Sequence, residues 1–88
     1  MTDAETAAQL TAWFGPTVAR TLTTAAQRAA AHRIHRMIAD TAGGAVATMW
    51  MVGMNPHLGD QAPFDVIADG RGRDVEAAAR GYLNGATT

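Results

Sequence analysis

The 88-residue chain contains no cysteine, no serine and no lysine. Without cysteine it can form no disulfide framework, no zinc site of the finger type and no thiol nucleophile. Without serine it also lacks the commonest hydroxyl nucleophile of hydrolytic enzymes. We therefore expect a protein that is not an enzyme, with no catalytic residues and no cofactor.

Long apolar runs are also missing from the sequence. The longest apolar segment, residues 45–52, is far shorter than the roughly 20 residues that a membrane-spanning helix needs. The N-terminal residues lack the basic start and long apolar stretch of a secretory signal. We therefore expect a cytoplasmic protein that does not enter a membrane. The formal net charge of −1 gives no global reason to expect a nucleic-acid partner.

Alanine is abundant in the chain. Hydrophobic residues make up 48% of the sequence, but much of that share is alanine, so bulky core residues are few. Alanine is the strongest helix former and has little volume to fill a sheet sandwich. We predict an all-α fold in which residues 1–88 form one domain, a compact bundle of four to six short helices. Because the core is thin and exposed methionines are costly, we also expect a homo-oligomer.

Capping and stop signals divide the chain into predicted helices. Thr2 with Glu5, and Thr24 with Gln27, have the spacing of a capping box. Glycines and prolines then mark helix ends and turns. The predicted helices are residues 2–14, 16–22, 24–41, 45–52, 64–69 and 73–83, with an ordered loop at 54–63 anchored by Leu58. The helices of residues 1–43 form one segment, and residues 45–85 form a second.

Apolar periodicity predicts the core. The predicted core residues are Leu10, Phe14, Ile34, Met37, Ile38, Met49, Trp50, Leu58, Ile67, Val75, Ala79 and Leu83. Of the methionines near Trp50, which are Met49, Met51 and Met54, we expect part to lie at an interface, because methionine adapts readily to binding surfaces.

Basic residues gather in the N-terminal half, where no acid occurs between Thr6 and Ala39. On a helical wheel, Arg28, His32, His35 and Arg36 lie opposite the apolar stripe, so we expect them to be exposed. Such a face could contact phosphates, which leaves open a DNA-binding transcriptional regulator. Its candidate contact residues are Arg20, Gln27, Arg28, Arg33 and Arg36. His32 and His35 lack a well-placed third ligand, so we predict no metal site.

Residues Trp50 to Pro63, followed by Val66-Ile67, Gly70, Val75 and Ala78-Ala79, form an ordered pattern. The pattern resembles the C-terminal toxin-binding domain of the Xre/MbcA/ParS-type antitoxins, which pair with RES-domain toxins. In that family a tryptophan-bearing helix leads into an Asn-Pro-x-Leu loop, a short proline-started helix with a glycine stop, and a final helix. The match covers about Ala45 to Leu83.

RES-type toxins are enzymes that degrade NAD. The resemblance implies that this chain binds such a toxin and covers the toxin's active site. The partner-binding residues that it implies are Asn55, Pro56, His57, Leu58, Asp60, Gln61, Pro63, Arg80, Tyr82 and Asn84. The chain departs from the family in its first forty or so residues, which carry no clear helix-turn-helix. That departure leaves open an interaction protein of phage origin with a different host partner.

Overall fold

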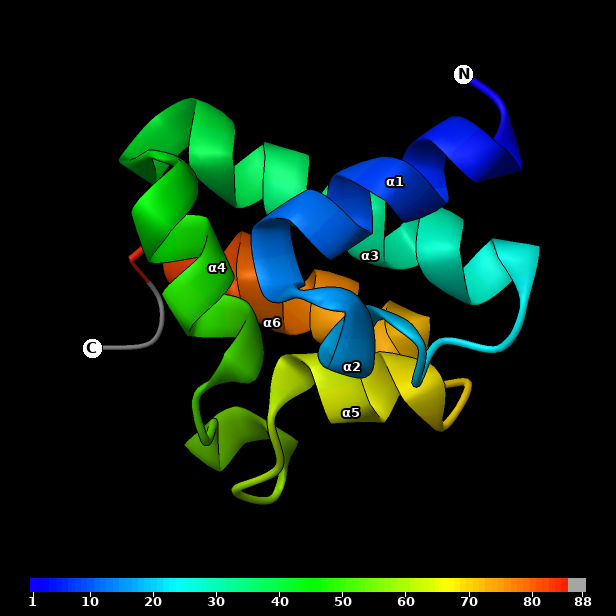
Figure 1. Ribbon diagram of the computed structural model, residues 1–88. Coiled ribbons are helices and arrows are strands. Elements are labelled where there is room, and N and C mark those ends of the chain that lie inside the picture. The colour runs from blue at the N-terminus through cyan, green and yellow to red at the C-terminus, as the bar shows by residue number, and fades with distance from the viewer. Residues whose placement is uncertain (86–88) are drawn as a thin grey trace.

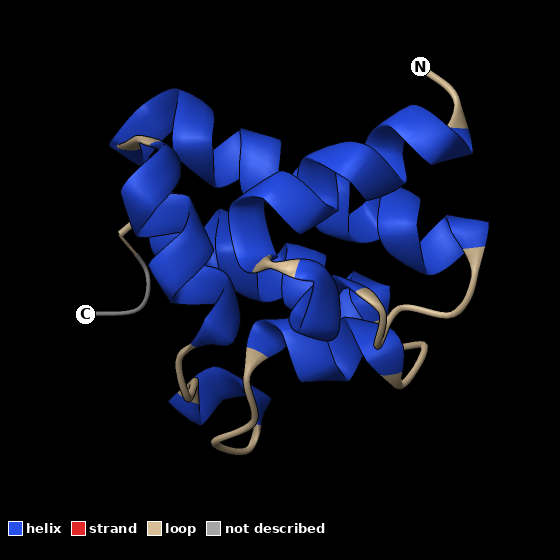
Figure 2. Cartoon of the chain, viewed as in Figure 1, coloured by secondary structure: helices blue, strands red, loops and turns tan. Residues whose placement is uncertain are grey.

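The computed structural model describes residues 1–85, which fold into six α-helices and one short 3-10 helix, without a strand (Figures 1 and 2). The prediction of an all-α bundle is confirmed. No helix in this range is both long enough and apolar enough to cross a membrane. The elements are α1 (Asp3–Phe14), α2 (Pro16–Ala19), α3 (Ala25–Ala42), α4 (Gly44–Val52), η1 (Pro56–Leu58), α5 (Pro63–Ala68) and α6 (Gly72–Leu83).

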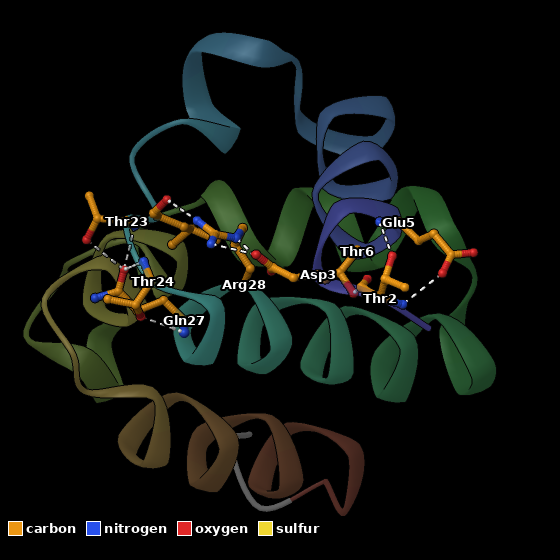
Figure 3. Close-up of polar contacts among 9 residues, drawn as sticks. Thr2, Asp3, Glu5, Thr6, Thr23, Thr24, Gln27 and Arg28 are labelled. Atoms are coloured by element: carbon orange, nitrogen blue, oxygen red, sulfur yellow. Dashed lines mark hydrogen bonds and ion pairs between the residues drawn. The ribbon is translucent and has the colours of Figure 1, made fainter.

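Helix starts and ends follow the local signals in the sequence. The Thr2 hydroxyl accepts from the Glu5 N–H, and the Glu5 carboxylate accepts from the Thr2 N–H at 2.7 Å. Thr24 and Gln27 repeat the arrangement at the start of α3, and both capping boxes are visible in Figure 3. Gly43 closes α3 with a φ of 96°, a conformation that favours glycine. The predicted ends of these two helices are therefore confirmed to within a residue or two.

Helix α3 is the centre of the bundle. It contacts α1 on one side and α5 and α6 on another, as Figures 1 and 3 show, and it also packs against α4. Its fully buried residues include Ala31, Ile34 and Ile38. Because α3 has neighbours in several directions, the helices around it bury their apolar sides mainly against one shared partner.

Most of the predicted core is confirmed. Seven residues are buried and four are partly buried against them; the seven are Leu10, Ile34, Ile38, Leu58, Ile67, Val75 and Ala79, and the four are Phe14, Met37, Trp50 and Leu83. The prediction for Met49 is wrong, because this side chain is 72% exposed. Helix α4 buries Ala47 and Met51, one turn apart, so Met49 between them points away from the core.

The predicted exposure of the basic face is also wrong for His35, which is only 2% exposed. Helix α1 covers that side of α3, and the Trp13 ring stacks on the His35 ring with centroids 3.8 Å apart. Trp13 also stacks on His32, which is half-buried, at 5.1 Å. Arg28 is half-buried too, and only Arg36 is exposed as expected. The helical wheel assumes that a helix has one buried side and one solvent-exposed side. Because α3 has partners on two sides, that prediction of exposure is wrong here.

Candidate functional site

Helix α4 presents an uncovered apolar side. Val46, Met49 and Val52 are 37%, 72% and 49% exposed, and Met54, just after the helix, is 83% exposed. We call these four residues the α4 face. Clusters of exposed large apolar side chains are uncommon on monomeric proteins and often mark interaction surfaces. Methionine side chains are flexible and polarizable, which suits them to adaptable contacts.

The α4 face borders an open cleft with a volume of about 300 Å³ between α4, η1 and α6. We call it the α4–α6 cleft. The Trp50 and Tyr82 rings approach each other here, with centroids 6.0 Å apart and planes inclined at 38°. Met49 and Met54 supply one side of the cleft, and Pro56 and His57 line it from η1. The cleft therefore combines aromatic and thioether groups with the imidazole of His57.

The loop beside the cleft is fixed by one buried residue, Asn55. Its side-chain oxygen accepts from the His57 N–H at 2.9 Å, and its carbonyl accepts from the N–H groups of Leu58 and Asp60 at 2.9 Å. Its own N–H donates to the Gln61 carbonyl at 3.1 Å. Leu58 is buried below the loop. The prediction of an ordered loop anchored by Leu58 is confirmed.

Backbone strain is concentrated at the tip of this loop. Gly59 and Asp60 both have left-handed conformations, with φ values of 67° and 65°. Asp60 is the one non-glycine residue of positive φ in residues 1–85. A strained, hydrogen-bonded turn of this kind persists only where its surroundings hold it. The loop thus has a fixed shape before any partner arrives.

The residues implied by the family resemblance fall into three groups. Asn55, Pro56, His57 and Tyr82 line the α4–α6 cleft, with Pro56, His57 and Tyr82 exposed. Asp60, Gln61, Arg80 and Asn84 are exposed outside it, and Arg80 pairs with Glu76 at 2.8 Å. Leu58 and Pro63 are buried and can only position the loop.

The sequence predicts the α4 face only in part. Of Met49, Met51 and Met54, part are expected at an interface, but Met49 also stands in the predicted core, and Val46 and Val52 are not among the predicted contact residues. The available signal is that α4 is apolar apart from Thr48, because so short a helix in a thin bundle cannot be buried all round.

The five candidate DNA-contact residues all have partners within the protein. Arg28 binds both oxygens of Asp3 at 2.8 and 2.9 Å and the Leu22 carbonyl at 3.2 Å, as Figure 3 shows in part. Arg33 pairs with Glu76 at 3.1 Å and Arg36 with Asp40 at 3.9 Å. Arg20 donates to the Pro16 carbonyl. The Gln27 side chain accepts from the Thr24 N–H at the start of α3 and donates to the Ala68 carbonyl at the end of α5. This arrangement lowers the positive potential available to phosphates.

The two histidines of α3 are held by the α1 and α4 helices. His32 contacts the Gln9 amide, and the His35 Nε2 lies 3.0 Å from the Thr48 hydroxyl. The His35 Nδ1 is buried and has no hydrogen-bond partner among the described residues. Burial lowers the pKa of both rings, and Arg36 adds to that effect. Among residues 1–85 no three His, Cys, Asp or Glu side chains gather as a metal site would require.

Comparisons of the chain with protein families, with curated proteins and with solved structures gave no match. Function must therefore be inferred from the chemistry of the surface itself. The most unusual part of that surface is the α4 face and the cleft beside it.

Proposed function

We propose that this chain is a small protein-binding module that grips its partner with the α4 face and the α4–α6 cleft. The observation that carries the proposal is the exposure of Met49 and Met54, 72% and 83%, beside a cleft containing Trp50 and Tyr82. Aromatic side chains and methionine are enriched at protein interfaces, and tryptophan and tyrosine often dominate their energetics.

Burial of these side chains would release substantial free energy. Covering one methionine fully is worth about 1.5–3 kcal/mol before the cost of fixing its rotamers. A partner would need to cover roughly 800 Å² of each surface, a standard interface. Against a total accessible surface of 4983 Å², that is about a sixth of the protein. The contact would therefore extend from the cleft onto the 55–61 loop and α6.

The fixed loop supports the same role. Its hydrogen bonds to Asn55 hold Pro56 and His57 in place at the edge of the cleft. A surface that is already ordered loses less conformational entropy when it binds. Function is often located on loops that a rigid scaffold supports in this way.

A RES-type toxin is the partner that we propose, by resemblance to the antitoxins. Residues named by that resemblance, including His57 and Tyr82, border the cleft, and the α4 face lies next to them. In this role the module would cover the toxin's active site and protect cellular NAD. No specific observation favours the DNA-binding alternative.

The test is toxin neutralisation in cells. A RES-domain toxin from the same genome is co-expressed with the wild-type chain or with the double variant Met49→Asp, Met54→Asp, and cellular NAD is measured. We expect the wild type to preserve NAD and the variant to lose that protection, because buried carboxylates without partners are costly. Ala29→Asp, at an exposed position on α3, is the matched control and should protect fully. Circular dichroism verifies that each variant is helical.

Two results would count against the proposal. One is a lack of protection by the wild type against every RES-type toxin of the genome. The other is protection that persists in the folded double variant. A second copy of the chain is the competing occupant of the α4 face, and light scattering separates the two. A wild-type dimer that Met49→Asp converts to a monomer would assign the face to self-association.

A further inference from the structure

A second cleft lies at the start of α6, away from the α4–α6 cleft. It is bordered by the first turns of α3 and the end of α5, and its volume is about 430 Å³. Ala30 and Ile67 contribute to an apolar floor, while Arg33, Arg71 and Arg73 line it with guanidinium groups. We call it the arginine cleft. Three basic side chains from two elements thus meet around an apolar surface.

Positive charge exceeds negative charge at this cleft. Arg33 uses its Nε to bind Glu76, and Arg71 uses its Nε to bind Asp74, both at 3.1 Å. The Arg73 side chain makes no hydrogen bond or ion pair with another residue of the described chain. One guanidinium therefore remains uncompensated. The Arg33 and Arg71 side chains are 60% and 49% exposed. Arg71 also donates from Nη1 to the Gln61 side-chain oxygen at 3.3 Å, which leaves its Nη2 and the Nη groups of Arg33 to turn towards a ligand.

The backbone at the start of α6 also attracts negative charge, as the arginine side chains do. Within residues 1–85, helix α6 begins at Gly72 without a side-chain cap. The Asp74 N–H donates to the Arg71 carbonyl at 3.1 Å, so the open N–H groups at this helix start are those of Gly72 and Arg73. The turn at Gly72 lies close to α3, where an added Cβ would be 3.4 Å from the Ala30 Cβ, a van der Waals contact. The uncapped helix start adds to the attraction that the arginines exert on an anion.

We propose that the arginine cleft binds a small organic anion, a phosphate or carboxylate group attached to an apolar body. The anion would be bound by Arg73 together with the free N–H groups of Arg33 and Arg71. The apolar body would lie over Ala30 and Ile67. Arginine suits this task because its planar fork matches the oxygens of carboxylates and phosphates. The site is independent of the protein-binding function proposed above.

The test uses phenyl phosphate and benzoate as probes, followed by amide NMR shifts at pH 7 and low salt. Benzyl alcohol provides the apolar body without the charge, and inorganic phosphate provides the charge without the body. We expect saturable shifts at Gly70, Gly72 and Arg73 with at least one of the two organic anions. Benzyl alcohol and inorganic phosphate should each bind at least roughly tenfold more weakly, because each lacks half of the recognition.

Two arginine variants distinguish specific binding in the arginine cleft from non-specific attraction of anions to the positive charges of the protein. Arg73→Gln removes the uncompensated charge at an exposed position and should weaken the organic anion about tenfold, the usual effect of losing one charge-assisted hydrogen bond. Arg20→Gln, on the exposed α2 segment, is the control and should leave binding unchanged. The proposal is overturned if neither anion gives saturable shifts. It is also overturned if benzyl alcohol binds equally well, or if the two variants behave alike.

Discussion

Mild acid should destabilise this protein through the histidines of α3. His35 lies between the Trp13 ring and the Thr48 hydroxyl, and its buried Nδ1 has no hydrogen-bond partner in residues 1–85. If Nδ1 took up a second proton, the new N–H would have no acceptor. Burial, with help from His32 and Arg36, lowers the pKa of His35 below the usual 6.5. Burial and Arg36 lower the pKa of His32 in the same direction.

The sign and size of the effect follow from proton linkage. Because the folded pKa values lie below the unfolded ones, the unfolded chain binds more protons as the pH falls below 6.5. The free energy of unfolding therefore drops with pH, by at most about 1.4 kcal/mol per pH unit for each histidine. The decline ends once the folded protein itself takes up the proton. Asp3, Glu5 and Glu76, whose pKa values are lowered from 3.8 or 4.5, act only at more acid pH.

The measurement is urea unfolding followed by circular dichroism at several pH values from 7.5 down to about 5, above the carboxylate range. His35→Leu should remove one histidine's share of the slope, whereas His57→Gln, at an exposed position on η1, should keep the full slope. At pH 7.5 we expect His35→Leu to differ from the wild type by less than about 1.5 kcal/mol. The variant loses the hydrogen bond to Thr48 and the stacking on Trp13, which lowers the free energy of unfolding. It also removes a buried nitrogen without a partner, which raises the free energy of unfolding by a similar amount.

This reasoning is refuted if the free energy of unfolding of the wild type is constant across that range. Equal slopes for the His35 and His57 variants would refute it as well. A slope that disappears only in a His32 variant would transfer the effect to that residue.

Two stability predictions concern the helices directly. Met51→Ala should lower the free energy of unfolding by about 2–5 kcal/mol, since this side chain is fully buried against the core; Val52→Ala, its half-exposed neighbour, should cost far less in the same urea titration. Thr24→Ala should cost about 1 kcal/mol through loss of the α3 cap, and equal thermal midpoints for Thr24→Ala and the exposed control Thr17→Ala would contradict that explanation.

The local parts of this fold could be predicted from the sequence. The Thr2 and Thr24 capping boxes, the glycine at the end of α3 and the Leu58-anchored loop all depend on residues within a few positions of one another. Such signals need no knowledge of the tertiary structure. They predict four to six helices, a range that includes the six α-helices observed, and most of the helix ends.

The faces of the helices could not be predicted with the same success. The burial of His35 depends on where α1 docks, and the exposure of Met49 depends on which side of the mostly apolar α4 meets α3. The arginine cleft is similar, because Arg33 lies far along the chain from Arg71 and Arg73. Only packing brings these groups together. A one-dimensional pattern shows that a helix has an apolar side, but not how many neighbours it will have.

The central position of α3 also determines how the protein opens. Helix α3 packs against four helices, α1, α4, α5 and α6. We therefore expect that α3 cannot unwind while these helices stay in place. Helix α1, in contrast, packs mainly on α2 and α3 and reaches α5 through the Phe14 ring, whose centroid lies 4.8 Å from that of Phe64, so its opening breaks fewer contacts than the opening of α3. The amide protons of α3 should therefore exchange with solvent only through global unfolding, and those of α1 through a smaller opening. The bundle thus has a hierarchy of cooperative units, with the N-terminal helix as its first part to open.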